Sequence, residues 1–172
     1  MARTRAERSG DHPSVDAIHR LAFETGLEAA IVETLRQAVE PLISIVAELD
    51  RGEVVGHIMF SPVTIDRRGG DIEFMGLAPM AVHPRYQNQG IGSRLVEEGL
   101  AACRTAGTEL VFVLGHPAFY PRFGFLPAVD SSFHYVDSRL DDYFFVQCVS
   151  AEGASVDSGT VAYHETFDID GV

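Results

Sequence analysis

The residues around Gly90 constrain the fold of this chain most, because the hydrophobic period changes there from that of a strand to that of a helix. From Ile72 to Val82 the chain is mostly apolar, as in a buried strand, and Glu109 to Leu114 has the same character. Between them, up to Gly107, apolar residues recur about one helical turn apart, at Ile91, Leu95, Val96, Leu100 and Cys103. Strand, helix and strand in this order are typical of a right-handed crossover, so the two strands are predicted to be parallel neighbours.

The remaining segments predict a largely antiparallel sheet with helices packed on it. Ser14 is expected to cap a helix that runs to about Phe23, and Thr25 with Glu28 to form the capping box of a second helix that ends at Pro41. Further strands are expected at Ala2–Arg8, Leu42–Leu49, Val54–Val63, Tyr143–Val149 and Thr160–Phe167, with one hairpin between the second and third and a closing hairpin between the last two. The predicted fold class is α+β (mixed α/β), in one domain over residues 1–172.

Charge and cysteine content narrow the classes of partner. The 172 residues include 13 Lys and Arg against 25 Asp and Glu, a formal charge of -12. This charge disfavours nucleic acid and membrane surfaces and favours a cationic substrate, although it also serves simply to keep a protein soluble. Cys103 and Cys148 match no metal-ligand spacing, so we expect reduced, structural thiols and no metal site. The polar N-terminus has no signal-peptide core, which predicts a cytoplasmic location.

The turn from Gln87 to Gly92 has the properties of an anion site. Its glycines let the backbone approach a ligand, and the helix that follows presents unpaired amides and the positive end of its dipole. The turn lacks the Gly-Lys-Ser/Thr ending of a Walker loop and the three spaced glycines of a dinucleotide fingerprint. A diphosphate is therefore expected there, against the alternative of a plain turn that happens to contain two glycines.

Two ordered motifs resemble the GNAT superfamily of N-acetyltransferases, and the small bacterial predicted acetyltransferases in particular. The first is Gln87-x-x-Gly90-x-Gly92 after Met80-Ala81-Val82, and the second is the aromatic segment Phe119–Phe125. The resemblance covers most of the chain and implies the GNAT-like fold, a central mixed, mostly antiparallel sheet flanked by helices with one parallel strand pair at the coenzyme A cleft. It also implies acetyl-CoA as cosubstrate.

The same resemblance assigns site residues by position. Ala81 and Val82 would lie along the pantetheine arm, and amides from Gln87 to Ser93 would hold the pyrophosphate. The implied cofactor-binding residues are Met80, Ala81, Val82, Gln87, Asn88, Gln89, Gly90, Ile91, Gly92 and Ser93. Tyr120 would face the thioester sulfur, where a phenol with a reference pKa of about 10 can donate a proton to the departing thiolate.

Other parts of the chemistry follow less directly from the residues. Because a proline cannot donate a ladder hydrogen bond, a bulge or a sheet edge is expected near Pro79. A bulge there would free a backbone amide for the oxyanion, or Pro79 simply occupies a tolerated irregularity. Glu73 and His116 are the candidate bases, with a rim carboxylate and a capping histidine as the structural alternatives. His57 and His83 are expected to pack or hydrogen-bond rather than bind metal. The segment Gly115-His116-Pro117 replaces an asparagine that superfamily members often carry, which puts one pantetheine contact in doubt.

These observations predict an enzyme that transfers an acetyl group from acetyl-CoA to a primary amine by direct attack in a ternary complex. The alternative is a non-catalytic acyl-CoA-binding or regulatory module, and a purely structural domain would require both motifs to be accidental. The acceptor, a small molecule or a peptide amine, would bind among the second helix, the hairpin region and the tail. The sequence leaves the oligomeric state open, a homodimer included.

Overall fold

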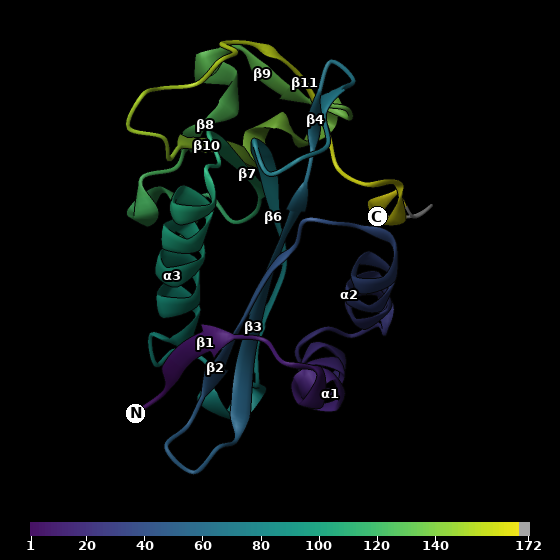
Figure 1. The fold of residues 1–172 in the computed structure, drawn as a ribbon, viewed down its shortest axis with the longest axis vertical. Coiled ribbons are helices and arrows are strands. Elements are labelled where there is room, and N and C mark those ends of the chain that lie inside the picture. The colour runs from purple at the N-terminus through teal and green to yellow at the C-terminus, as the bar shows by residue number, and fades with distance from the viewer. Residues whose placement is uncertain (169–172) are drawn as a thin grey trace.

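The computed structural model describes residues 1–168, which form two sheets and three α-helices (Figure 1). The seven-stranded sheet has the order β1-β2-β3-β6-β7-β10-β8, and the four-stranded sheet the order β5-β4-β11-β9. The strands are β1 (Arg3–Ala6), β2 (Ile43–Glu48), β3 (Val54–Pro62), β4 (Thr64–Ile65), β5 (Arg68–Gly69), β6 (Phe74–Val82), β7 (Leu110–Leu114), β8 (Leu126–Pro127), β9 (Phe133–Tyr135), β10 (Phe144–Cys148) and β11 (Gly159–Ala162). The helices are α1 (His12–Ala22), α2 (Leu27–Ala38) and α3 (Ile91–Ala106).

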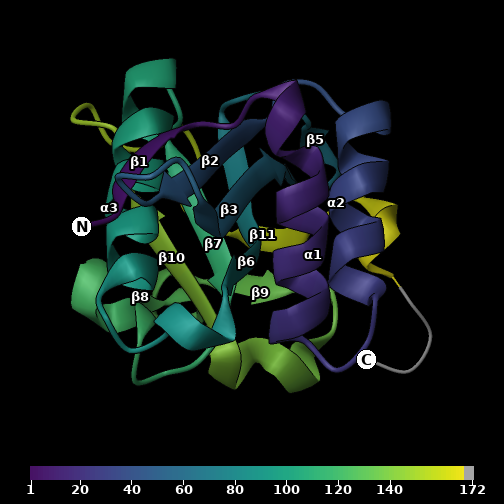
Figure 2. The same ribbon diagram turned by 90° about the horizontal axis from the view of Figure 1, so that it is seen from below.

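Helices cover both faces of the large sheet, with α3 on one side and α1 and α2 on the other (Figure 2). The buried face of α3 carries the predicted apolar residues Ile91, Leu95, Val96, Leu100 and Cys103. Gly107 ends the helix with φ 94°, a conformation that glycine adopts without steric cost. Gly99 also lies on this face, where an added Cβ would stand 2.3 Å from the Phe60 ring. The helix therefore approaches β3 closely at this point.

The prediction that the two strands are parallel neighbours is confirmed, since β6 and β7 pair in parallel. Their pairing ends at Leu77 opposite Val113, whereas β6 continues antiparallel to β3 as far as Val82. Beyond Leu77, β6 therefore has a strand partner on one side only. This splitting of the sheet opens a gap along Ala78–Val82.

The predicted irregularity at Pro79 is a bulge. Ile58 of β3 lies opposite Met80, and Phe60 lies opposite Leu77. The single residue between them, Met59, therefore faces both Ala78 and Pro79, which is the arrangement of a β-bulge. The bulge stands at the point where β6 parts from β7.

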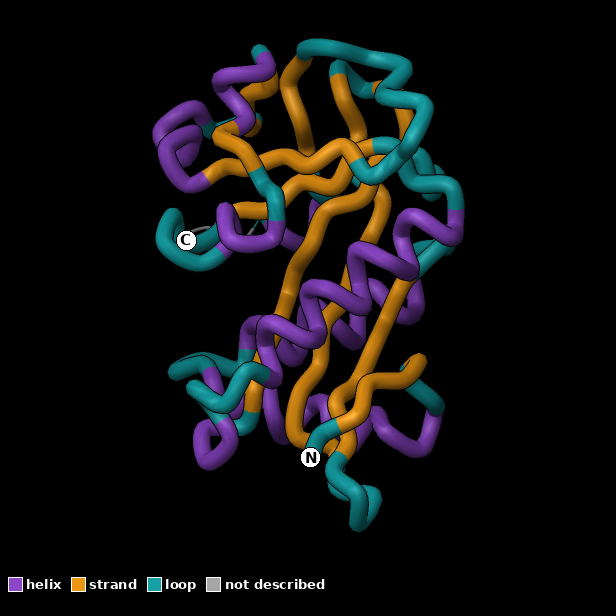
Figure 3. The backbone as a smooth tube through the Cα atoms, turned by 90° about the vertical axis from the view of Figure 1, so that its left-hand side faces the viewer, coloured by secondary structure: helices purple, strands orange, loops and turns teal. Residues whose placement is uncertain are grey.

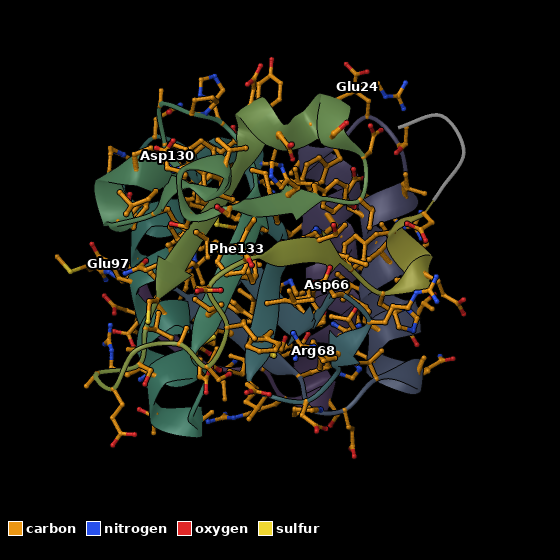
Figure 4. The ribbon with its side chains drawn as sticks, turned by 90° about the horizontal axis from the view of Figure 1, so that it is seen from above. Glu24, Asp66, Arg68, Glu97, Asp130 and Phe133 are labelled. Carbon is orange, nitrogen blue, oxygen red and sulfur yellow. The ribbon has the colours of Figure 1, made fainter. Side chains whose placement is uncertain are left out.

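The prediction of a closing hairpin in the tail is wrong. Strand β10 inserts antiparallel between β7 and β8, while β11 pairs with β4 and runs parallel to β9 in the small sheet. Figure 3 shows short strands gathered at the upper end of the molecule, where Figure 1 labels β4, β8, β9, β10 and β11. Asp66, labelled in Figure 4, holds β11 there, because its carboxylate accepts a hydrogen bond from Thr160 N at 2.9 Å.

The starts of the first two helices differ from their predictions. Helix α1 begins at His12, before Ser14, and follows a 3₁₀ turn, η1 (Ser9–Asp11). The capping box of α2 does not form, because Gly26 occupies the N-cap position and has no side chain to cap the helix. Thr25 Oγ1 accepts only a 3.4 Å contact from Leu27 N. Glu28 therefore does not form the capping-box hydrogen bond that the sequence predicted for it.

A network of polar side chains connects α1, β3, β2 and α2 on the face of the large sheet that α1 and α2 cover. His19 Nε2 is 2.8 Å from His57 Nδ1, and His57 Nε2 is 2.8 Å from Ser44 Oγ. Ser44 Oγ in turn donates to Glu7 at 2.7 Å, and Glu7 pairs with Arg36. Because the hydroxyl proton of Ser44 is used on Glu7, Ser44 accepts from His57 and His57 accepts from His19. Both histidines are then neutral, as their burial requires.

Desolvation sets the pKa values of the two histidines in this hydrogen-bond network. Burial lowers the pKa of His19 to about 4, and the nearby charge of Arg36 acts in the same direction. Burial also holds the pKa of His57 well below its ordinary value. Among the described residues, His19 Nδ1 has no hydrogen-bond partner, consistent with its being the unprotonated nitrogen. His57 thus has the hydrogen-bonding role expected of it.

Candidate active site

Two cavities lie along the part of β6 that no longer pairs with β7. The first, which we call the turn cavity, measures about 520 Å³ and follows the segment from Met80 to Ser93. The second, the aromatic cavity, measures about 620 Å³ and extends from the bulge of β6 toward α2 and the tail. Met80 and Phe119 line both. The two cavities therefore meet beside the bulge.

The turn cavity collects nine of the ten residues that the sequence assigned to cofactor binding: Met80, Ala81, Val82, Gln87, Asn88, Gly90, Ile91, Gly92 and Ser93. Gln89 is not in its lining, and its side-chain amide donates instead to Arg85 O at 3.3 Å. Gln87 also supports the turn, because its Nε2 donates to Val82 O at 3.0 Å. These two side chains hold the backbone of the turn in place.

The backbone of the turn presents amides at the start of α3. Asn88 and Gly90 have φ values of 60° and 81°, which turn the chain sharply into the helix. Arg94 N donates to Gly90 O at 3.1 Å, so the intrahelical ladder begins there. The amides of Ile91, Gly92 and Ser93 belong to the first turn, where no intrahelical acceptor exists. They are available for an anion, and the helix dipole favours one.

Gly92 leaves open space in the wall of the turn cavity. A Cβ added there would meet Met80, Val82 and Phe119 only at 3.8 Å, an ordinary van der Waals distance. The protein's own packing therefore does not require glycine at this position. The missing side chain instead leaves room for a ligand against the helix.

Sequence reasoning missed Arg122, which brings a positive charge to the turn cavity. Its guanidinium carbon lies 4.7 Å from the centre of the Phe119 ring and 5.4 Å from that of Phe123. Its Nη2 is 3.5 Å from Ser93 Oγ at the start of α3. Arginine has the donor geometry for phosphate, and here two aromatic rings hold it in position. The only available signal was its place inside the aromatic motif.

Tyr120 lies in the aromatic cavity at the first position of the 3₁₀ helix η3 (Tyr120–Phe123). Its side chain is buried, and burial raises the pKa of its hydroxyl to about 12. A Cβ added at Gly115 would stand 2.0 Å from the Tyr120 ring, so the ring rests directly on the backbone after β7. The segment that begins at Gly115 therefore supports the ring of this tyrosine.

The structure separates the two candidate bases. His116 lines the aromatic cavity, but its Nδ1 already accepts a hydrogen bond from Ala118 N at 3.1 Å. Glu73 lies in the turn before β6, outside both cavities, where Ser155 Oγ donates to its carboxylate at 2.9 Å. Glu73 lies seven positions before Met80, which corresponds to about 23 Å of extended strand. The structure therefore does not bring Glu73 to Tyr120.

Two further properties concern residues 1–168 as a whole. No three His, Cys, Asp or Glu side chains in this part of the chain are grouped to hold a metal ion. Within the same range, no helix combines the length and apolar character needed to cross a bilayer. Cys103 and Cys148 are both free, and burial raises the pKa of the Cys103 thiol to about 12.

Comparison with known proteins gives consistent results. A family profile described as "Acetyltransferase (GNAT) domain" matches residues 3–128. The uncharacterized N-acetyltransferase YhbS of Escherichia coli K12 is 37% identical over 164 residues, which cover 95% of this chain and 97% of YhbS. The crystal structure of E. coli YhbS in complex with CoA superposes with a TM-score of 0.91, at 34% identity, covering 99% of this chain and 94% of that one. A GNAT acetyltransferase of Brucella melitensis in complex with acetyl-CoA gives 0.79 at 35% identity, covering 98% and 99%.

Proposed function

Because this chain belongs to the GNAT family of acetyl-CoA-dependent N-acetyltransferases, we propose that it acetylates a primary amine by direct attack in a ternary complex. The observation that carries the proposal is the meeting of two cavities at Met80 and Phe119. One cavity has the features of a diphosphate site, and the other contains a buried tyrosine. A thioester at their junction could be reached by an amine without a covalent enzyme intermediate.

The cosubstrate is proposed to lie along the turn cavity. Its pyrophosphate would accept hydrogen bonds from the first-turn amides of α3, and Arg122 would pair with one of its phosphates. The pantetheine arm would follow Met80–Val82, where β6 has no strand neighbour on the β7 side. Its amide groups could then take the place of the missing strand. The open edge of β6 and the space at Gly92 support this placement.

The chemistry is proposed to use Tyr120 and the bulge. Attack of the neutral amine forms the N–C bond, and a backbone amide near Pro79 would stabilise the oxyanion of the tetrahedral intermediate. Collapse then breaks the C–S bond. A thiolate whose conjugate acid has a pKa of about 8.5 would take its proton from Tyr120. Burial raises the pKa of Tyr120 to about 12, so this donor stays protonated at neutral pH.

The geometry argues against His116 as a direct base. Since Nδ1 of its ring accepts the Ala118 amide, the neutral imidazole has its proton on Nε2. In this orientation Nε2 is a donor and cannot take a proton from the ammonium group. His116 would have to give up its backbone contact first. Because Glu73 lines neither cavity, removal of the amine proton is assigned to another group or to water.

The test is acetyl transfer to a panel of primary amines, with CoA affinity measured in parallel by calorimetry. Saturable CoA binding together with acetylation of an amine would support the proposal. CoA binding without transfer to any amine would favour the non-catalytic module, and absence of CoA binding would refute both. A single domain over residues 1–172, a homodimer and a cytoplasmic location stay predictions from the sequence.

A further inference from the structure

The charged side chains that line the aromatic cavity are acidic. They are Glu28, Asp137 and Asp168, and none of the 13 arginines of the chain lines this cavity. Asp137 is already engaged, because Arg139 Nη2 contacts its carboxylate at 2.7 Å. Asp168 is exposed at the end of the described chain. Glu28 remains as the partly buried lining residue whose carboxylate forms no ion pair among residues 1–168.

One carboxylate oxygen of Glu28 is buried and has no hydrogen-bond partner among the described residues, which favours binding of a ligand there. Its Oε2 is shielded from solvent and has no hydrogen-bond partner within residues 1–168. A buried carboxylate oxygen without a partner is costly and therefore uncommon in native proteins. Glu28 also makes no capping bond at the start of α2. A cation in the adjoining cavity would supply the missing partner.

The other walls of the cavity are aromatic and apolar. Phe23 and Phe167 line it, as do the rings of Tyr135 and Tyr163. Tyr163 donates its hydroxyl proton to Phe112 O at 2.9 Å, so that polar group is already satisfied. Burial raises the pKa of Tyr135, and the nearby carboxylates of Asp168 and Asp137 act in the same direction. The cavity thus combines an apolar surface with a negative potential.

We propose that Glu28 binds the ammonium group of the acceptor, and that the acceptor is a small arylalkyl monoamine whose ring lies among the aromatic walls of the cavity. This inference rests on the proposed function and specifies its substrate class. The volume of about 620 Å³ lies within the range of small-molecule sites. Aromatic walls bind both an aryl group and, through their faces, an ammonium group. A polyamine would leave most of this apolar surface without a matching group.

The experiment measures binding of 2-phenylethylamine to the CoA-loaded protein by calorimetry at pH 7.5, so that turnover is not required. The variant Glu28→Gln keeps the shape of the side chain and removes its charge. Glu24→Gln is the matched control, because Glu24 precedes α2, is exposed at the outer edge of the molecule (Figure 4) and is not part of the cavity lining. The uncharged isostere 2-phenylethanol, together with spermidine and a short peptide with a free N-terminus, completes the panel.

We expect 2-phenylethylamine to bind wild type and the Glu24→Gln variant equally, and Glu28→Gln about tenfold or more weakly, as expected for loss of a charged hydrogen bond. 2-Phenylethanol should bind weakly to all three proteins. CoA affinity and the thermal midpoint should not fall in Glu28→Gln, because the variant removes an unpaired carboxylate.

Several results would overturn the inference. These are absence of 2-phenylethylamine binding to wild type, equal binding by Glu28→Gln, or tighter binding of spermidine or the peptide. Each would leave the proposed acetyl transfer standing as long as CoA still binds. Failure of wild type to bind CoA would instead refute the proposed function itself.

Discussion

The free energy of unfolding should fall as the pH is lowered from 6.5 to 4.5, because His19 and His57 are buried as neutral side chains. Unfolding exposes both rings to water, where an imidazole has a pKa of about 6.5. The folded protein holds the pKa of His19 at about 4 and that of His57 well below its ordinary value. In this pH range the unfolded chain therefore binds more protons than the folded chain. Stability is complete above pH 6.5 and is lost as the pH falls toward the folded pKa.

The magnitude can be worked out for His19 alone. A pKa of about 4 in the folded state, against 6.5 unfolded, corresponds to a loss of about 2.5 kcal/mol by pH 4.5. His57 adds to this loss, although the two rings share a hydrogen bond and titrate as a pair. Small domains have free energies of unfolding of about 5–15 kcal/mol, so the effect is large. Asp11, whose pKa Arg5 lowers to about 2, loses its stabilisation mainly below pH 4.5, because an unfolded aspartate takes up its proton near pH 3.9.

The assay is urea unfolding followed by far-ultraviolet circular dichroism at pH 7.5, 6.5, 5.5 and 4.5. His19→Gln should retain an amide that can bond to His57 while removing one titrating ring, so the pH slope should fall by about one proton. Phe23→Leu is the control, because Phe23 stacks on His19 at 6.0 Å but does not titrate. It should lower stability equally at every pH. A free energy of unfolding that stays constant from pH 6.5 to 4.5, or a full slope in His19→Gln, would refute the reasoning.

Three further predictions concern the cofactor, the chemistry and the core. Tyr120→Phe should lower kcat about 100-fold or more, and wild-type kcat should not decline up to pH 10 because burial raises the Tyr120 pKa to about 12; unchanged turnover would exclude the general acid. Gly92→Ala should weaken CoA binding in calorimetry while its urea midpoint stays close to wild type, since the new Cβ meets protein atoms only at 3.8 Å; a lowered midpoint with normal CoA affinity would contradict this. Gly99→Ala should destabilise the protein by about 1–3 kcal/mol in urea unfolding, because its Cβ would stand 2.3 Å from the Phe60 ring; a gain in stability from helix propensity would show that the ring moves aside.

Patterns that are local in sequence predicted the structure well. The helical period from Ile91 to Cys103 and the apolar run up to Val82 each depend on residues that are neighbours along the chain. The family motif predicted most residues of the turn cavity for the same reason, since most of the residues that line this cavity belong to one contiguous segment. Pro79 predicted a bulge or a sheet edge, because a proline removes a ladder donor in any strand, and the structure has a bulge there.

Features made by distant residues could not be predicted in this way. Strand β11 pairs with β4 and β9, and no local pattern selects these partners over β10. The capping box failed because Gly26, not Thr25, occupies the N-cap position. Glu28 and Arg122 acquired their positions from tertiary packing, and Glu73 was separated from Tyr120 by the length of a strand. The sequence alone shows these residues as ordinary charged side chains.

The two cavities that meet where the pairing between β6 and β7 ends differ in how the chain builds them. The turn cavity is built mainly from residues 80–93, which enter it as a single piece of backbone. The aromatic cavity is assembled from segments scattered between Phe23 and Asp168. Substitutions in α2 or in the tail can therefore reshape one cavity while the other stays intact. In a protein built in this way, the acceptor can change in evolution, or by design, while the residues that bind the cosubstrate stay the same.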